Sequence, residues 1–121
     1  KKHALAARKG LSLRDLLAWP WVLPSVLSTT RVAVSEAYLR QGLAPPVPIV
    51  ESPSFFYSLS LVAQTDLLTC CAHSAAIQNH HQTSILDVKS GLESAPVAMV
   101  WRKSSALACR AAETLAQISQ P

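Results

Sequence analysis

Apolar positions along the chain follow two spacings, one typical of short buried strands and one typical of helices. Short apolar runs bounded by proline or polar residues predict strands at residues 21–23, 47–51, 67–71, 85–89 and 97–101. Helical spacing between these runs predicts helices at residues 12–19, 28–40, 53–64 and 104–119, with a short helix or turn at 72–78. This alternation with short connections favours an α/β fold, in which a parallel sheet is covered by helices and the crossovers are right-handed.

Capping residues mark the ends of the predicted helices. Ser12 followed three residues later by Asp15 is a variant of the capping box. Ser28 or Thr29 is placed to cap the next helix, and Gly42 to follow its end. The apolar positions expected to share one face of that helix are Val32, Ala33, Ala37, Tyr38 and Leu39. The final helix is predicted to start at a cap formed by Ser104 or Ser105, with an apolar stripe of Leu107, Ala111, Leu115 and Ile118.

Proline and serine residues lie in the second predicted strand and at the start of the helix after it. Pro48 lacks a backbone donor, so the strand at 47–51 is expected near a sheet edge or irregular at its start. Ser52 followed by Pro53 is a strong signal for the start of an apolar helix. The sequence therefore predicts a strand that leads directly into the N-terminus of a helix.

The turns after the predicted strands are the best chemical feature of the chain. Ligands of parallel sheets bind beyond the carboxyl ends of the strands, which here are residues 24–28, 51–54 and 72–74. A helix N-terminus has free N–H groups and a positive dipole end, and it accepts a carboxylate or another small anion. Ser52 and Ser54 would add hydroxyl donors, and Phe55 and Phe56 an apolar wall. Alternatively, Ser52 only caps the helix and the phenylalanines are core; the same two interpretations apply to the turn at 24–30.

Length and charge limit the classes of function. The 121 residues are half hydrophobic and form one domain or a piece of one. The net charge of +4 is scattered, without a dense basic stripe, so direct nucleic-acid binding by this segment is not indicated. No secretion signal is visible, and no apolar run is long enough to span a membrane. The chain does not begin with Met, so we expect a fragment of a larger cytoplasmic protein.

Cysteines and histidines offer little support for catalysis or metal binding. Cys70 and Cys71 are neighbours on a predicted strand and point to opposite faces, so they are not expected to bond to each other. The odd count of three cysteines suggests a reducing compartment. His73, His80 and His81 have no carboxylate or thiol at ligand spacing, so we predict no metal site, no cofactor and no catalytic residue. An enzyme fragment using Cys71 and His73 is kept as an alternative.

Three collinear segments of the chain resemble LysR-type transcriptional regulators. They read HALAARKGLSLRDLLAWPWVLP, VESPSFFYSLSLVAQTDLLTCCAHSA and APVAMVWRKSSALACRAAETLAQIS. The resemblance covers nearly the whole chain, and it is the order of the three segments together, rather than any one of them, that is specific to the family. It departs at Gln64, Thr65 and Asp66, where the family often has a glycine pair, so the geometry of that turn can differ.

The resemblance implies the fold and the domain organisation. Such regulators carry an N-terminal winged helix-turn-helix that binds DNA, and an effector domain similar to type 2 periplasmic-binding proteins, with two α/β subdomains around a cleft. This chain would supply a Rossmann-like subdomain, the second of the two, at residues 10–92. Residues 1–9 and about 93–103 would be crossover segments, and the rest of 93–121 would be the terminal helix of the first subdomain.

The resemblance also implies the ligand and the partners. The effector of these regulators lies between the subdomains, and the matching positions here are Pro24, Ser25, Ser28, Ser52, Ser54 and Phe55. We expect a small anionic metabolite as effector, DNA contact only through the missing N-terminal domain, and a homo-oligomer, either a dimer or a tetramer. The expected function is effector sensing rather than catalysis. One lobe of a solute-binding transport protein is the alternative.

Overall fold

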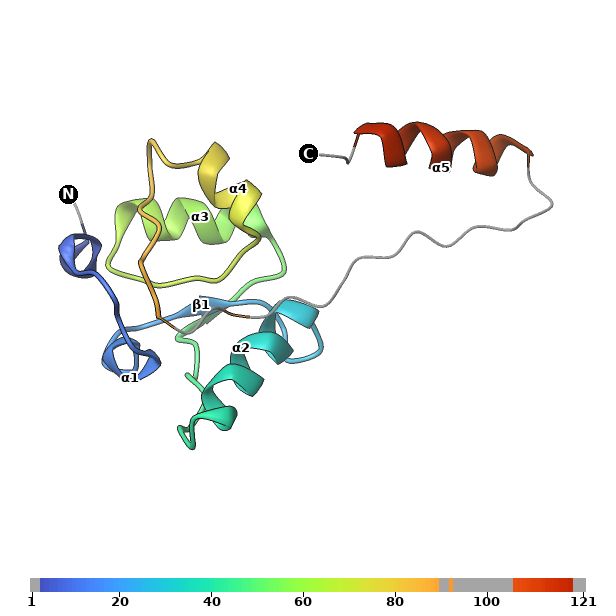
Figure 1. Ribbon diagram of the computed structural model, residues 1–121. Helices are drawn as coiled ribbons and strands as arrows, with labels where there is room; N and C mark the ends of the chain where they lie inside the picture. Colours follow the sequence, from blue (N-terminus) through green and yellow to red (C-terminus); the bar gives the residue numbers. More distant parts are fainter. Residues whose placement is uncertain (1–2, 90–91, 93–105, 119–121) are drawn as a thin grey trace.

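The computed structural model of the chain describes residues 3–89, 92 and 106–118 (Figure 1). Its elements are η1 Ala4–Ala7, α1 Leu13–Leu16, β1 Val22–Leu23, α2 Thr29–Arg40, β2 Val50–Glu51, α3 Phe55–Gln64, α4 His73–Gln78 and α5 Ala106–Ile118. The first two predicted strands and the predicted helices are confirmed in these ranges. The predicted strand at 97–101 and the cap at Ser104 or Ser105 lie outside the described residues.

A parallel pair of strands lies at the centre of the fold. Val22 of β1 lies opposite Val50 of β2, and Leu23 opposite Glu51. β1 is fully buried, whereas β2 is only partly covered. Pairing in the predicted strand at 47–51 begins only after Pro48, as expected from the donor that proline lacks.

Two isolated parallel bridges lie outside the named strands. Leu68 forms a parallel bridge with Trp21 on the other side of β1, and Leu11 forms one with Val88. The strands predicted at 67–71 and 85–89 are therefore much shorter than expected. Asp87 and Lys89 also make backbone hydrogen bonds with Leu11, but no further bridge forms in the described part of these runs.

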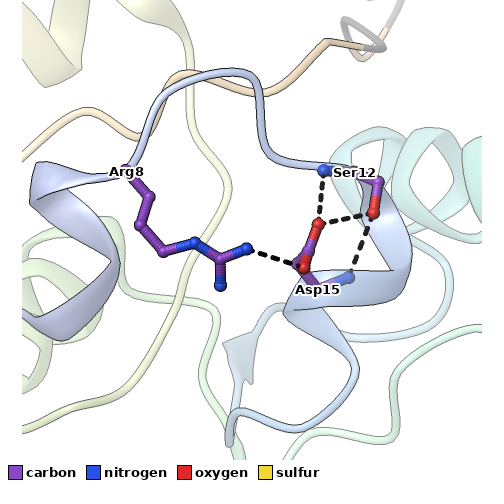
Figure 2. A network of polar contacts seen from close by, with 3 residues as sticks. All are labelled: Arg8, Ser12 and Asp15. Atoms are coloured by element: carbon purple, nitrogen blue, oxygen red, sulfur yellow. Dashed lines mark hydrogen bonds and ion pairs between the residues drawn. The ribbon is translucent and has the colours of Figure 1, made fainter.

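α1 begins with the predicted capping box, which Figure 2 shows together with Arg8. The Ser12 N–H donates to Asp15 Oδ2 over 2.9 Å, and the Asp15 N–H donates to Ser12 Oγ over 3.3 Å. The Ser12 hydroxyl also donates to Asp15 Oδ2 over 2.6 Å, and Arg8 Nη2 lies 3.0 Å from Asp15 Oδ1. α1 ends at Leu16, because tight turns occupy the next residues before Pro20, and it is shorter than the predicted helix.

α2 has the predicted start and end. The Ser28 hydroxyl accepts the Arg31 N–H over 3.1 Å, so Ser28 rather than Thr29 is the cap. Gly42 follows the helix with φ +68°, and its N–H donates to the Leu39 carbonyl oxygen over 2.9 Å. Only glycine adopts this left-handed conformation without strain, which explains the end of the helix at this point.

The buried face of α2 is only partly the predicted one. Ala37 and Tyr38 are buried, and they share the buried face with Val34. Val32 and Leu39 are 44% and 61% exposed, so their assignment to the core was wrong. Positions 34, 37 and 38 follow the i, i+3, i+4 spacing of one narrow stripe, and both exposed residues lie off it.

Helices cover the sheet on both sides. Figure 1 shows α3 and α4 on one side of β1, and α1 and α2 on the other. The core between them is formed by Leu5, Leu11, Leu13, Leu16, Trp21, Leu23, Val34, Ala37, Tyr38 and Leu68. Burial of these side chains supplies most of the driving force for folding. None of the described helices is both long and apolar enough to cross a membrane.

The last predicted helix is also present, as α5. Ala111, Leu115 and Ile118 of its predicted apolar stripe are exposed, and the side chain of Leu107 lies outside the described residues. The apolar stripe of α5 is thus open to solvent at these three positions.

Candidate ligand-binding site

The carboxyl ends of β1 and β2 meet at one edge of the sheet. The Ser52 N–H donates to the Leu23 carbonyl oxygen over 3.0 Å, which extends the parallel ladder beyond Glu51. Because the two strands run in the same direction, the turn after β1 and the turn after β2 lie side by side. This edge therefore holds all six residues that the sequence singled out, namely Pro24, Ser25, Ser28, Ser52, Ser54 and Phe55.

The turn after β2 differs in detail from its prediction. Ser52 is buried, and its hydroxyl accepts the Ser54 N–H over 3.2 Å. Ser54, not Ser52, is the cap of α3, because its hydroxyl accepts the Tyr57 N–H over 3.3 Å. The helix consequently begins at Phe55, two residues later than the Ser52–Pro53 pair predicts. Ser52 instead closes the tight turn that brings the chain from the sheet to the helix.

The turn after β1 is built in a similar way. The Ser25 hydroxyl accepts the Leu27 N–H over 3.3 Å, and the Ser25 carbonyl oxygen accepts the Ser28 N–H over 2.9 Å. Ser28 then caps α2. These serine oxygens accept backbone bonds, and each hydroxyl still carries a hydrogen that it can donate to a ligand.

Two helix N-termini consequently point toward one edge. The caps satisfy the third amide of each helix, at Arg31 and Tyr57. The first amides of a helix have no partner within the helix, and they carry the positive end of its dipole. The amides of residues 29–30 and 55–56 are therefore suited to a small anion.

Arg31 is a residue that the sequence reasoning missed. It lies in the first turn of α2, and its Nη1 atom is buried without a hydrogen-bond partner among the described residues. A cation at the N-terminus of a helix opposes the helix dipole and is unfavourable there. An arginine in the first turn of α2 was therefore the sequence signal that could have identified Arg31 as a functional residue. A buried guanidinium nitrogen without a partner is costly, and an anionic ligand in contact with it would offset that cost.

Apolar side chains flank the same edge. Leu27 is 89% exposed and Phe56 is 75% exposed, and the Phe55 ring lies 5.6 Å from the Phe56 ring. The interpretation that both phenylalanines are core is therefore wrong for Phe56. An exposed apolar surface beside polar groups is typical of a surface that contacts a ligand or another domain.

A cavity of about 760 Å³, partly open to solvent, is bordered by α2, α3 and α4 and by residues 67–72 and 82–86. None of the six predicted site residues lines it, although Thr29 and Thr30 at the start of α2 do. Its volume is typical of small-molecule pockets. The sequence reasoning did not predict this cavity.

The candidate nucleophile of the enzyme alternative lies on this cavity wall. Burial raises the pKa of the Cys71 thiol, and burial with the adjacent Cys71 raises the pKa of Cys70 to about 11. Both thiols are therefore protonated at neutral pH and poor nucleophiles. Within the described ranges, no group of three or more His, Cys, Asp or Glu residues is placed to hold a metal ion.

A parallel strand pair with helices on both sides is an α/β arrangement in which ligands bind beyond the carboxyl ends of the strands. The family described as LysR substrate binding domain matches residues 1–120, and the chain belongs to this family. The match gives no support to the transport alternative, and LysR-type regulators are generally not enzymes.

Relatives and solved structures were also compared with the chain. Two relatives are each named HTH-type transcriptional regulator GbpR. The one from Azospirillum brasilense is 33% identical over 54% of this chain and 19% of its own length. The one from Rhizobium radiobacter is 27% identical over 61% of this chain and 24% of its own length. No solved structure matches the chain.

Proposed function

We propose that this chain is the effector-sensing part of a LysR-type transcriptional regulator and that its effector is a small anionic metabolite. The observation that carries the proposal is the meeting of two capped helix N-termini at one sheet edge, held by the bond between Ser52 and Leu23. The buried Nη1 atom of Arg31, which has no hydrogen-bond partner among the described residues, supports the negative charge of the effector. No catalytic step is assigned to the chain, since its described thiols are held in the protonated form.

The domain organisation is part of the proposal. Residues 10–92 form the second effector-binding subdomain, residues 1–9 and about 93–103 cross between subdomains, and α5 belongs to the first subdomain. The exposed stripe of α5 and the apolar edge around Leu27 and Phe56 then pack against parts of the regulator beyond this chain. The effector would bridge the two subdomains at the edge, with Pro24, Ser25, Ser28, Ser52, Ser54 and Phe55 on one wall.

Ligand binding would control DNA binding from a distance. Anion contacts made only in the closed cleft favour closure, and the free energy of that difference is available to shift the regulator between two states. In this proposal DNA is contacted through an N-terminal domain of the regulator, and both relatives are named HTH-type transcriptional regulators. We place the regulator in the cytoplasm as a homo-oligomer, either a dimer or a tetramer.

The test is a calorimetric titration of the full-length regulator with a panel of small carboxylates and their uncharged amides. We expect binding of carboxylates only, weakened about tenfold or more by Arg31→Gln, because a charge-assisted bond is lost. Ser54→Ala should weaken it less. Arg14→Gln, an exposed arginine on α1, and Ser60→Ala, an exposed serine on α3, are the matched controls. Amides that bind as tightly as carboxylates, or variants that bind like the controls, would refute the anionic site.

A further inference from the structure

The wall of this partly open cavity contains a buried hydroxyl group without a partner. Tyr38 is fully buried on α2 and lines the cavity, and its hydroxyl oxygen has no hydrogen-bond partner in the described part of the chain. Trp21, whose ring lies 6.5 Å from the Tyr38 ring, differs in this respect, since its Nε1–H donates to the Leu16 carbonyl oxygen. A buried donor left unpaired is destabilising, so the Tyr38 hydroxyl requires an acceptor that the described protein does not supply.

The described cavity wall carries no carboxylate, ammonium or guanidinium group, and its imidazoles are those of His3 and His73. Among its lining residues there is no Asp, Glu, Lys or Arg, and most are aliphatic, such as Leu59, Val62 and Leu86. The thiols of Cys70 and Cys71 on the same wall are protonated, and burial raises the pKa of Tyr38 to about 12, so the phenol is a neutral donor. Burying an ion here without a counter-charge would be strongly unfavourable.

We propose that this cavity is a second ligand site, which takes an uncharged, largely apolar small molecule whose one hydrogen-bond acceptor bonds to the Tyr38 hydroxyl. The apolar lining supplies affinity by burying the ligand body, and Tyr38 supplies orientation. This site differs from the proposed anion site in chemistry and in its residues, although the two share the first turn of α2. The inference stands whether or not the edge binds an anion.

Two probes test it, acetophenone, which carries a carbonyl acceptor, and ethylbenzene, which has a similar body without one. In NMR titrations of the whole 121-residue chain, acetophenone should shift the amide signals of cavity residues such as Leu59 and Ala76. It should leave the signal of Ser54 at the edge unchanged. Acetophenone should bind about fivefold or more tightly than ethylbenzene, as expected for one net hydrogen bond.

Two variants locate the binding. Tyr38→Phe keeps the ring but removes the hydroxyl, and it should erase the preference for acetophenone; Tyr57→Phe, an exposed tyrosine on α3, is the control. Ala63→Phe places a ring in the cavity and should abolish binding of both probes, whereas Ala44→Phe on the surface should not. Failure of acetophenone to bind at millimolar concentration would overturn the site, because water or another segment of the chain would then fill the cavity. An acetophenone preference that survives Tyr38→Phe would overturn the role of Tyr38.

Discussion

The N–H of Ser52 donates a 3.0 Å hydrogen bond to the carbonyl oxygen of Leu23, and this bond couples the candidate edge to the core. Leu23 is fully buried in the centre of the fold, while Ser52 closes the turn that leads into α3. The position of the α3 N-terminus therefore depends on packing beneath the sheet as well as on local capping. Substitutions in the core are expected to disturb the site through this connection.

Replacing Leu23 tests the core beneath this edge. Leu23→Ala should lower the free energy of unfolding by about 2–5 kcal/mol, because it removes a fully buried side chain and leaves a cavity. Leu27→Ala removes an exposed leucine only four residues away and should change the free energy of unfolding by less than about 0.5 kcal/mol. Urea unfolding measures both, and similar losses in the two variants would contradict the described core.

The cap of α3 can be assigned by mutation. Ser54→Ala should cost about 1 kcal/mol, since the Tyr57 N–H loses its acceptor. Ser54→Asp should retain most of the stability, because aspartate is also a good cap and favours the positive end of the helix dipole. Denaturant unfolding provides the measurement, with Ser60→Ala as the control. Equal stability of Ser54→Ala and Ser54→Asp would show that another residue caps the helix.

Asp15 should make stability depend on pH in acid. Hydrogen bonds from the Ser12 hydroxyl and the Ser12 N–H, together with Arg8, lower the pKa of Asp15 from 3.8 to about 2. A carboxylate with a lowered pKa stabilises the fold above its ordinary pKa, and this contribution disappears as the pH falls from about 4 through about 2.

Asp15→Asn should therefore be less stable than the wild-type chain at pH 5, and the difference should shrink toward pH 2. Denaturant unfolding at several pH values measures this trend, and an NMR titration of the Asp15 carboxyl carbon measures its pKa directly. Glu36→Gln, on the exposed surface of α2, serves as the control. A constant difference between Asp15→Asn and wild type from pH 5 to pH 2 would contradict the role of the capping box.

Substitutions of Gly42, the glycine after α2, should lower stability by different amounts. Gly42 has φ +68°, and a Cβ atom there would meet no atom within 4 Å, so any penalty comes from the backbone alone. Gly42→Ala should cost about 1–2 kcal/mol. Gly42→Asn should cost less, because asparagine tolerates the left-handed region better. Thermal unfolding distinguishes the two, and an Ala variant as stable as Asn would argue against a left-handed residue.

The protonated state of the cysteines can be checked by alkylation. Cys70 and Cys71 should react slowly with iodoacetamide at pH 7, because burial raises the pKa of both thiols. The same peptides should react much faster in urea, where burial is lost. Mass spectrometry of the labelled peptides gives the rates for each segment. Fast selective labelling of Cys71 in the folded chain would instead favour the enzyme alternative.

Local signals in the sequence predicted much of the fold. The Ser12–Asp15 capping box, the cap at Ser28 and the glycine at 42 are all confirmed, and so are the first two strands and the helices of the described ranges. These features rest on hydrogen bonds between residues two to four positions apart, or on the φ angle of one residue. They need no knowledge of distant partners, so the sequence by itself determined them.

Tertiary structure decided the features that depend on distant residues. The Ser52 N–H pairs with Leu23 across the sheet, and α3 starts after Ser54 rather than at Pro53. The same holds for the buried stripe of α2, for the single bridging positions of the short strands, and for the cavity beside Tyr38. Each is set by which surfaces meet when segments far apart in the chain pack together. The residue pattern contains the apolar positions that can be buried, but only the packed fold determines which of them are.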